Sequence, residues 1–539
     1  MKSEYISFIF LLILSNSVLP TISAKNHRCG VDLLKKPKRV LVDVEKDNMR
    51  NLKNSSWEQF RVHFDFSYLN NNKDKISLKD YTDITEKIMP KTKEVLEKLF
   101  KVRRLNTKLK LNAPNCDVYP IPEEYLEGVD ADIVIFVIVD ISGYYLENQI
   151  EAAAAHCLQN SENRRPIAGY IQIKPYLNVN DSIALDYMTW LVLHEITHIL
   201  VLNTALYDDF INSETLLPLG YRNILGKSTR EDGSYYVYLK SPKVLEKARK
   251  HFGCATLQGV PLESIGGTGT VGSHWSKKYM NTDYMIGDSY GENLISEISL
   301  ALFEDSGWYQ IDYSVANLFL WGKNKGCEFF SKRCGEPIED SSNEMKSNFK
   351  EEFCDNSNMS TCSISNIFRG TCKTYRYFNQ LKTTERYFKD PYLGGFDELT
   401  EKCPIPHEIP NDATYYPGSC RVGQISSSNS NFEKICPECA CFLTSNKKEI
   451  TKKENLKFYF KQSDPLMKNK SQAGCFEFKC EGSELYVLLD EKKIKCRNGE
   501  SISINGYDRN IICPNSENLC HPQYECKFGC TEKYKNISN

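Results

Sequence analysis

The alternation of apolar and polar positions predicts a series of strands and helices in the first two hundred residues. WEQFRVHFDFSYL at 57–69 alternates aromatic or apolar with polar side chains, which is typical of a strand. Residues 80–105 repeat apolar side chains at helical spacing and predict one amphipathic helix despite Pro90. ADIVIFVIVD at 131–140 and IAGYIQIKP at 167–175 predict two further strands. The helix DYMTWLVLHEITHIL follows.

This order predicts an α+β subdomain in which the last helix lies behind a sheet. From residue 201 to about 325 the pattern becomes irregular and rich in glycine. Beyond Cys327, short strand-like runs alternate with turns and cysteines, which predicts a mainly β and loop region. No internal repeat of fixed period is evident in the sequence.

The one long apolar run, SFIFLLILSNSVLPTISA, lies close to the start and ends in small residues. Its order predicts a secretory signal peptide over residues 1–24; an uncleaved signal anchor is the alternative, but the run is short for a membrane span. The chain end CTEKYKNISN carries no signal for a lipid anchor. We therefore expect a soluble protein that is secreted or delivered to a secretory organelle.

Twenty-one cysteines in an exported chain predict a disulfide framework, and twelve of them fall between Cys403 and Cys530. The motif CPECAC in this tail is interpreted as disulfide-bonded rather than metal-binding. Five sequons fit the same export route and predict a glycoprotein. The net charge of −2, with basic residues dispersed among acidic ones, gives no indication of nucleic-acid binding.

Candidate chemistry is concentrated in the segment LVLHEITHIL. On a helix, His194 and His198 are four residues apart and share one face, so both imidazoles can reach one zinc ion while Glu195 projects beside them. Zinc-assisted hydrolysis needs this arrangement, because the metal acidifies a water and a carboxylate takes its proton. Two core histidines with satisfied hydrogen bonds would give the same short pattern.

A catalytic zinc site usually has a third protein ligand, for which the sequence offers several candidates. His251 lies in the basic run KARKHFGC, typical of a helix end. His274 follows GGTGTVGS, a backbone able to fold back over a cleft. Glu214 in NSETL is a thermolysin-like alternative that lacks the usual NE pair. His63 and His156, in an upstream strand and helix, are interpreted as packed or surface groups.

Several motifs in order resemble the leishmanolysin family of surface metalloproteases, which belongs to the metzincins. These are HEITH, HFGCATLQGVPLESIGGTGTVGSHW, DYMIG and ISLALFEDSGWYQIDYSVANLFLWGKNKGCEFFSKRC, within a resemblance that spans about residues 55–375. The long gap between the second and third histidines is itself a feature of the family. The resemblance implies His194, His198 and His274 as ligands of one zinc ion per chain, Glu195 as the catalytic base and Met285 as the methionine of the Met-turn.

One position departs from the family pattern. The family usually has glycine three residues after the second motif histidine, where this chain has Val201. A β-branched residue is strained at positive φ, so this departure predicts either a different turn or reduced activity.

The resulting prediction is a secreted zinc metalloendopeptidase that hydrolyses protein or peptide substrates, with a zincin-like catalytic domain and a cysteine-rich C-terminal domain. A catalytically weak or inactive adhesion protein on the same scaffold is the alternative, favoured by Val201. The oligomeric state is not predicted. The predicted divisions are a signal peptide at 1–24, a pro-segment at 25–53, catalytic subdomains at 54–200 and 201–325, and the cysteine-rich domain at 326–539.

The resemblance also suggests how some cysteines act. It suggests that Cys254 pairs with Cys327 around the third ligand, and Cys116 with Cys157 before the motif helix. The odd cysteine is assigned to Cys29 in HRCG, which lies 87 residues before the next cysteine; an intermolecular disulfide or an idle thiol is the alternative. The resemblance implies an inhibitory role, because leishmanolysin-like precursors carry an inhibitory cysteine in a similar setting. A thiolate there would take the fourth zinc position until the pro-segment is removed by cleavage between residues 36 and 54.

Overall fold

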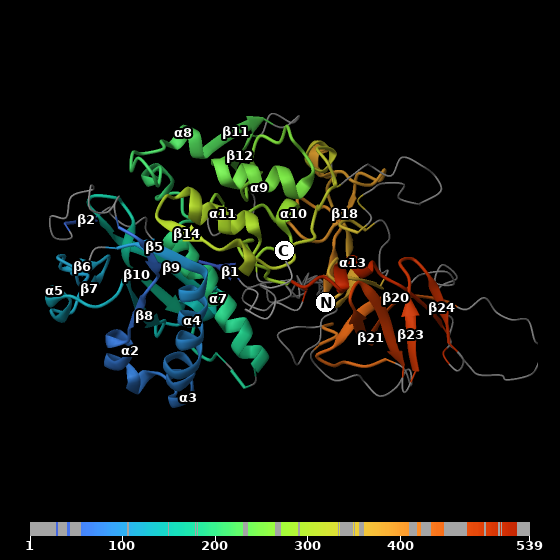
Figure 1. The fold of residues 1–539 in the computed structure, drawn as a ribbon, viewed down its shortest axis with the longest axis horizontal. Helices are drawn as coiled ribbons and strands as arrows, with labels where there is room; N and C mark the ends of the chain where they lie inside the picture. The colour runs from blue at the N-terminus through green and yellow to red at the C-terminus, as the bar shows by residue number, and fades with distance from the viewer. Residues whose placement is uncertain are drawn as a thin grey trace, which may run out of the picture.

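The computed structural model describes residues 28–30, 40–43 and 55–524, apart from internal gaps, the longest of which are 335–348, 409–417, 422–432 and 447–471. The predicted signal peptide, His27, most of the predicted processing region and the glycine-rich run 265–270 lie outside the described residues. The chain forms a mixed α/β part beside a C-terminal β region (Figure 1). No helix in the described ranges is long and apolar enough to cross a membrane.

A six-stranded sheet forms the framework of the N-terminal part. Its strands are ordered β1 (Arg28–Cys29), β9 (Ile150–Asn160), β10 (Pro166–Ile173), β8 (Ile133–Val139) and β4 (Val62–Asp65), and β2 (Val40–Val42) also pairs with β9. Strand β10 is parallel to β8 and antiparallel to β9. All seven residues of β8 are buried, as its continuous apolar sequence predicts for a central strand covered on both faces.

The predicted strand at 57–69 is wrong in detail, because the chain passes between two sheets there. Strand β3 (Trp57–Gln59) pairs with β5 (Phe100–Arg103) in a sheet completed by β14 (Tyr309–Ile311), whereas β4 pairs with β8. A short helix, α2 (Ser67–Asn71), follows. The buried ring of Phe60 lies at the crossover and packs against Phe100 and Tyr309.

The predicted helix at 80–105 is confirmed over most of its length and ends earlier. Helical structure runs through α3 (Leu78–Thr82), a π-helical turn (Asp83–Ile88) and α4 (Met89–Leu99). Pro90 directly follows the π-helical turn, and the helix continues through it. The residues after Leu99 form β5, because their backbone pairs with β3 and β14.

The alanine-rich segment IEAAAAHCLQN forms β9, so the assignment of His156 to a helix is wrong. Alanine favours helix locally, but these residues pair with β10 on one side and with β1 and β2 on the other, and tertiary pairing overrides the propensity. Residues 28–29 and 40–42, within the predicted pro-segment, are therefore strands of this sheet.

Helix α7 (Ser182–Leu200) confirms the predicted motif helix and packs against β9 and β10. The approach is close at Gly169, where an added Cβ would lie 2.6 Å from Cγ2 of Ile199. The sheet therefore brings a glycine and an alanine run under the helix. This contact fixes the distance of α7 from the sheet and its rotation about its own axis. The direction in which its histidines point follows from both.

The segment from 201 to 325 is more regular than its sequence predicts. It contains α8 (Tyr221–Ile224), a sheet of β11 (Leu225–Thr229), β12 (Tyr235–Leu239) and β13 (Val260–Pro261), and helices α9 (Pro242–Phe252), α10 (Lys277–Met280) and α11 (Glu297–Asp305). Helices α9 and α11 pack together, and the Asp305 carboxylate accepts the backbone N–H groups of Lys243 and Val244 at the start of α9.

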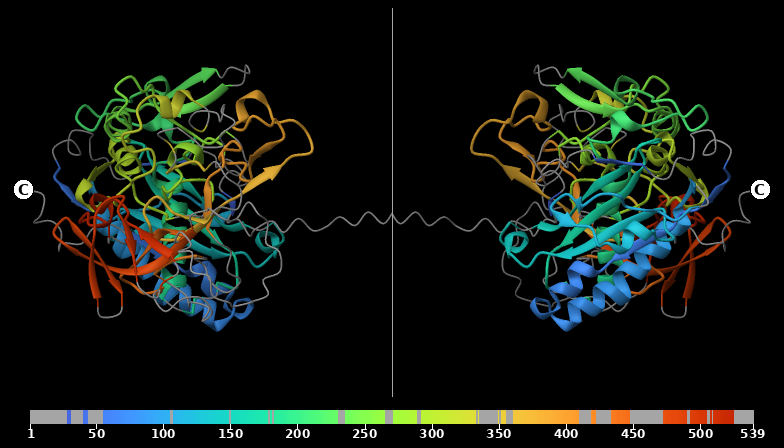
Figure 2. Two further views of the ribbon diagram at one scale, coloured as in Figure 1. Left: turned by 90° about the vertical axis from the view of Figure 1, so that its right-hand side faces the viewer. Right: turned by 90° about the vertical axis from the view of Figure 1, so that its left-hand side faces the viewer.

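The C-terminal region is a disulfide-rich β structure, as its cysteines and short strand-like runs predict. Its largest sheet is ordered β23 (Lys492–Cys496), β22 (Glu484–Leu489), β21 (Gln472–Glu481), β20 (Cys439–Asn446), β25 (Arg509–Ile512) and β24 (Ser501–Ser503). Smaller sheets comprise β15 (Ser360–Cys362), β16 (Arg369–Cys372) and β19 (Pro406–Glu408), and the pair β17 (Thr374–Arg376) and β18 (Leu393–Gly395). Figure 2 shows the orange segment with β17 and β18 beside the green central segment.

Candidate metal centre

The two motif histidines point the same way from α7, and their outer nitrogens are oriented by backbone carbonyls. The His194 Nδ1 lies 2.7 Å from the Tyr284 carbonyl oxygen, and the His198 Nδ1 lies 2.8 Å from that of Leu202. A carbonyl only accepts hydrogen bonds, so each Nδ1 carries the proton and each Nε2 presents a lone pair. This is the tautomer that a metal ligand requires.

The structure brings His274 to the same point from a segment 76 residues further along the chain. Its Nε2 lies 3.1 Å from the Nε2 of His194 and 3.2 Å from that of His198, which are themselves 3.1 Å apart. Backbone bonds hold the segment in place: the His274 carbonyl accepts from the N–H of Glu263, and the Trp275 N–H donates to the Met285 carbonyl.

These residues fit a zinc ion. Nitrogens bonded to one tetrahedral zinc at about 2.0–2.1 Å lie about 3.3 Å from each other, close to the separations found. The Nε2 lone pairs of His194 and His198 face each other in a buried space. They repel each other unless a cation lies between them. Burial lowers the pKa of His194 to about 4, against the opposing effect of its bond to Tyr284, so the ring is neutral at neutral pH.

Cys29 lies at the same cluster. Its thiol sulfur is 3.5 Å from the His198 Nε2, and the ligand atoms of Cys29, His194, His198 and His274 all lie within 4.8 Å of one another. Strand β1 positions it by pairing with β9, where Cys29 lies opposite Ala152 and the Gly30 N–H donates to the Ala152 carbonyl. A Cβ at Gly30 would lie 3.0 Å from Ile150, so glycine suits this close approach.

Glu195 and Met285 are both buried completely. Met285 lies in a turn whose backbone is held by the Asp283 carboxylate, which accepts from the Met285 N–H and from the Ser296 and Ser299 hydroxyls.

Sequence reasoning missed Tyr145, on the short helix α6 (Tyr144–Glu147). Burial and the nearby charge of Glu195 raise the pKa of Tyr145, and no local sequence pattern indicates this proximity.

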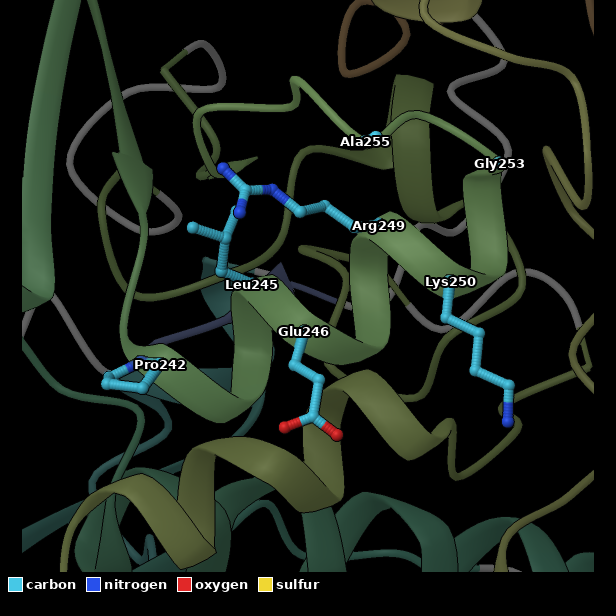
Figure 3. Close-up of a pocket in the computed structure, with 7 residues that line it drawn as sticks. All are labelled: Pro242, Leu245, Glu246, Arg249, Lys250, Gly253 and Ala255. Carbon is cyan, nitrogen blue, oxygen red and sulfur yellow. The ribbon is translucent and has the colours of Figure 1, made fainter.

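The alternative third ligands lie elsewhere. Glu214 is exposed in a turn after Ile211, and it is not part of the cluster. The His251 Nε2 donates to the Trp321 carbonyl at the end of α9 and packs on Phe319, as a core histidine would. Figure 3 shows a separate open depression beside α9, lined by Pro242, Leu245, Glu246, Arg249, Lys250, Gly253 and Ala255, which contains none of the candidate ligands.

Val201 does not need the strained conformation expected from the family pattern. Its φ is not positive, its side chain is fully buried, and its N–H donates to the Thr197 carbonyl as α7 ends. The following N–H, of Leu202, donates to the same carbonyl, which turns the Leu202 carbonyl toward His198. The turn therefore differs from one that requires glycine.

The disulfides agree with the sequence predictions. Cys116 bonds to Cys157, and Cys254 bonds to Cys327. In the tail, Cys436 bonds to Cys439 and Cys441 to Cys362, so CPECAC is disulfide-bonded as predicted. Of the cysteines that the structure describes, Cys29 is the one outside a disulfide.

Comparison with known proteins gives the family. The sequence profile described as leishmanolysin matches residues 37–526. The chain belongs to the leishmanolysin family. A leishmanolysin-like peptidase of Caenorhabditis briggsae is 28% identical over 477 residues, covering 75% of this chain and 68% of that protein. A leishmanolysin-like peptidase of Drosophila melanogaster is 26% identical over 461 residues, covering 74% of this chain and 65% of that protein. A leishmanolysin homolog of Crithidia fasciculata is 30% identical over 321 residues, covering 59% of this chain and 44% of that protein.

Membership of the leishmanolysin family supports a metallopeptidase, a hydrolase that acts on protein substrates. The chain spans about two thirds of the length of the nematode and fly relatives. The histidine and cysteine cluster is a group that can hold the metal ion such an enzyme uses.

Proposed function

We propose that this chain is a secreted, zinc-dependent metalloendopeptidase with a metzincin-like catalytic domain, made as a latent precursor. The observation that carries the proposal is the convergence of three buried imidazole Nε2 atoms within 3.2 Å of each other. Glu195, which follows His194 on the same helix, is also fully buried. His194, His198 and His274 would hold the zinc. Met285 would form the floor of the site as the methionine of the Met-turn. Secretion rests on the apolar run at 1–24 and on the disulfides.

A zinc ion at this site supplies Lewis-acid chemistry, which acidifies water and polarises a peptide carbonyl. The protein supplies the base. The Glu195 carboxylate takes a proton from the attacking water as its oxygen bonds to the carbonyl carbon, and returns the proton to the amide nitrogen as the C–N bond breaks. Burial of Glu195 keeps bulk water away and strengthens its electrostatic interactions with the reacting groups.

We also propose that Cys29 keeps the precursor latent. Its sulfur lies at the histidine cluster, on a strand that occupies the free edge of β9. A thiolate at that point would take the position that the attacking water needs. Removal of the N-terminal segment, by cleavage between residues 36 and 54, would vacate both the metal position and this part of the sheet edge.

The catalytic proposal is tested with purified, processed protein on casein, with and without a zinc chelator. We expect one zinc per chain and cleavage that the chelator abolishes. Glu195→Gln should reduce kcat by about 10²- to 10⁴-fold, the contribution typical of a general base, with zinc retained. Glu214→Gln is the matched control and should cleave normally. Parental cleavage by Glu195→Gln would contradict the assignment of the base.

Latency is tested on the unprocessed chain. The parental precursor should be inactive, and a Cys29→Ser precursor should cleave casein before any processing. Equal activity of the two unprocessed chains, both with zinc bound, would show that Cys29 does not inhibit the precursor.

Adhesion is the second function considered from the sequence, and Val201 is the feature that favoured it. Because Val201 ends α7 without a positive φ, the residue no longer argues against catalysis. The casein assay separates the two functions, since an adhesion protein would bind without cleaving.

A further inference from the structure

The chain on either side of His274 is held by different parts of the molecule. Before His274 the bonds lie within the central segment: the Glu263 N–H donates to the His274 carbonyl at 2.8 Å, and the Gly272 N–H donates to the Glu263 carbonyl at 2.9 Å. Three residues after His274 the chain enters α10, which is only four residues long. A helix of one turn has little stability of its own, so contacts with other segments must hold α10 in place.

Two consecutive lysines attach α10 to the C-terminal region. The Lys277 ammonium lies 2.6 Å from an Asp397 carboxylate oxygen, and the Lys278 ammonium lies 3.0 Å from one of Glu401. All four side chains are at most a tenth exposed, and a lysine is rarely buried unless it is paired. Figure 1 shows α10 next to β18, which ends shortly before Asp397. Neighbouring residues of a helix point about 100° apart, so the two contacts together fix both the position and the rotation of α10.

The two acids lie in a turn that is itself firmly held. The Thr400 hydroxyl lies 3.0 Å from the Asp397 carbonyl oxygen and 2.9 Å from that of Cys403. Cys403 forms a disulfide with Cys334, which follows the short helix α12 (Glu328–Ser331). A rigid part of the C-terminal region therefore presents the acids to α10.

Lys277 also has acidic neighbours in the central segment. Its ammonium lies 2.5 Å from Asp288, and its backbone N–H donates to the Glu263 carboxylate at 3.4 Å. Glu263 thus bonds to His274 through its backbone and to Lys277 through its side chain, so a shift of Lys277 is passed on to His274. Removing the charge of Asp397 leaves Lys277 paired with Asp288 and breaks only the link to the C-terminal region.

We propose that Asp397 and Glu401 are positioning residues for the metal centre. They hold Lys277 and Lys278, and these two lysines fix the point at which the chain leaves His274. The C-terminal region therefore takes part in placing the third zinc ligand. This inference rests on the proposed zinc peptidase function and assigns a further part of the chain to the same site.

The test measures the Kd of zinc for the processed protein by competition with a chelator, at a temperature at which every variant is folded. Asp397→Asn and Glu401→Gln should each raise this Kd by about 2- to 30-fold, the scale of coupling through packed networks. The amides keep the shape of the side chains and remove their charge.

A double-mutant cycle checks that the effect passes through His274. In a His274→Ala background, Asp397→Asn should leave the Kd of zinc unchanged, because no third ligand remains to be positioned. A substitution that only destabilised the protein would act on both backgrounds alike.

Exchanging one ion pair gives a rescue. Glu401→Lys alone should raise the Kd of zinc, because it places two ammonium groups side by side. Combining it with Lys278→Glu restores the pair in reverse and should bring the Kd back toward the parental value. If the exchanged pair does not fold, the amide variants and the cycle still decide the question.

Two controls match the amide variants. Glu398→Gln changes an acid of the same turn whose side chain is 72% exposed and pairs with Lys402. Asp83→Asn changes a buried carboxylate of the N-terminal part, which lies 2.6 Å from each of the Lys79 and Lys87 ammonium groups. Both controls should keep the parental Kd.

Three results would overturn the inference. The first is a parental Kd in both Asp397→Asn and Glu401→Gln. The second is an equal rise in Asp83→Asn, which would mean that loss of any buried carboxylate weakens zinc binding. The third is an equal effect of Asp397→Asn with and without His274. Absence of zinc from the parental protein, measured first, would instead refute the proposed function.

Discussion

Helix α7 and the segment from His274 to Met285 both contribute to the candidate metal centre, but their residues are positioned in different ways. The helix sets the spacing of His194 and His198 by itself, because residues four apart share a face. His274 depends on tertiary structure: on backbone bonds to Glu263, on the turn at Met285 and on the Cys254–Cys327 disulfide. The relative position of His194 and His198 is therefore insensitive to many changes elsewhere in the chain. The position of His274 changes whenever the tertiary contacts that hold its segment change.

The largest effect is expected from removing the distant ligand. His274→Ala should weaken zinc binding by more than the roughly 10- to 100-fold typical of losing an outer partner of a metal ligand, because a ligand itself is lost. His251→Ala is the control and should keep its zinc, since that side chain donates to the Trp321 carbonyl and is not part of the histidine cluster. Zinc content after dialysis against graded chelator measures both. Full zinc retention by His274→Ala would contradict the ligand assignment.

Breaking the Cys254–Cys327 disulfide should loosen the distant ligand without altering it. The bond closes 73 residues, and its removal should lower the free energy of unfolding by about 4 kcal/mol. Zinc affinity should fall with it, because His274 lies within the closed loop. Both cysteines are replaced by alanine. Denaturant unfolding then measures the free energy of unfolding, and zinc titration measures the zinc affinity.

The comparison bond is Cys496–Cys513, which closes 17 residues in the C-terminal sheet. Its loss should cost about 3 kcal/mol and leave zinc affinity unchanged. If both pairs of substitutions reduced zinc affinity equally, the disulfide around His274 would have no special part in placing that ligand.

A smaller effect is expected at the end of α7. Val201→Gly restores the residue usual in the family, yet it should destabilise the protein by about 2–3 kcal/mol, because a buried side chain is lost and no strain is relieved. Activity per folded molecule should not rise. Thermal unfolding and casein cleavage test this, and a clear gain in kcat would show that valine distorts the turn.

The same contrast explains which parts of the structure could be predicted from sequence. The buried strand β8 and helix α7 were predicted because their local patterns and tertiary environments agree. Strand β9 was missed because its alanines favour helix and only neighbouring strands make them extended. Strands β1 and β2 have no periodic pattern of their own, and their structure comes from the edge of β9.

The candidate site divides in the same way. His194, Glu195 and His198 follow from helical spacing, whereas His274, Met285 and Cys29 were identified by resemblance to the family. The proximity of Tyr145 to Glu195 could not be found from sequence, because it depends on segments brought together only in the fold. Of the two outcomes predicted at Val201, the structure shows the different turn, since hydrogen bonds to Thr197 end the helix without a positive φ.

The most direct test of the account is zinc-edge X-ray absorption of the purified precursor, compared with its Cys29→Ser variant. The account predicts three nitrogen ligands at about 2.0–2.1 Å and one sulfur ligand at about 2.3 Å in the precursor, and no sulfur in the variant. A precursor spectrum without sulfur, or a variant that retains it, would contradict the account.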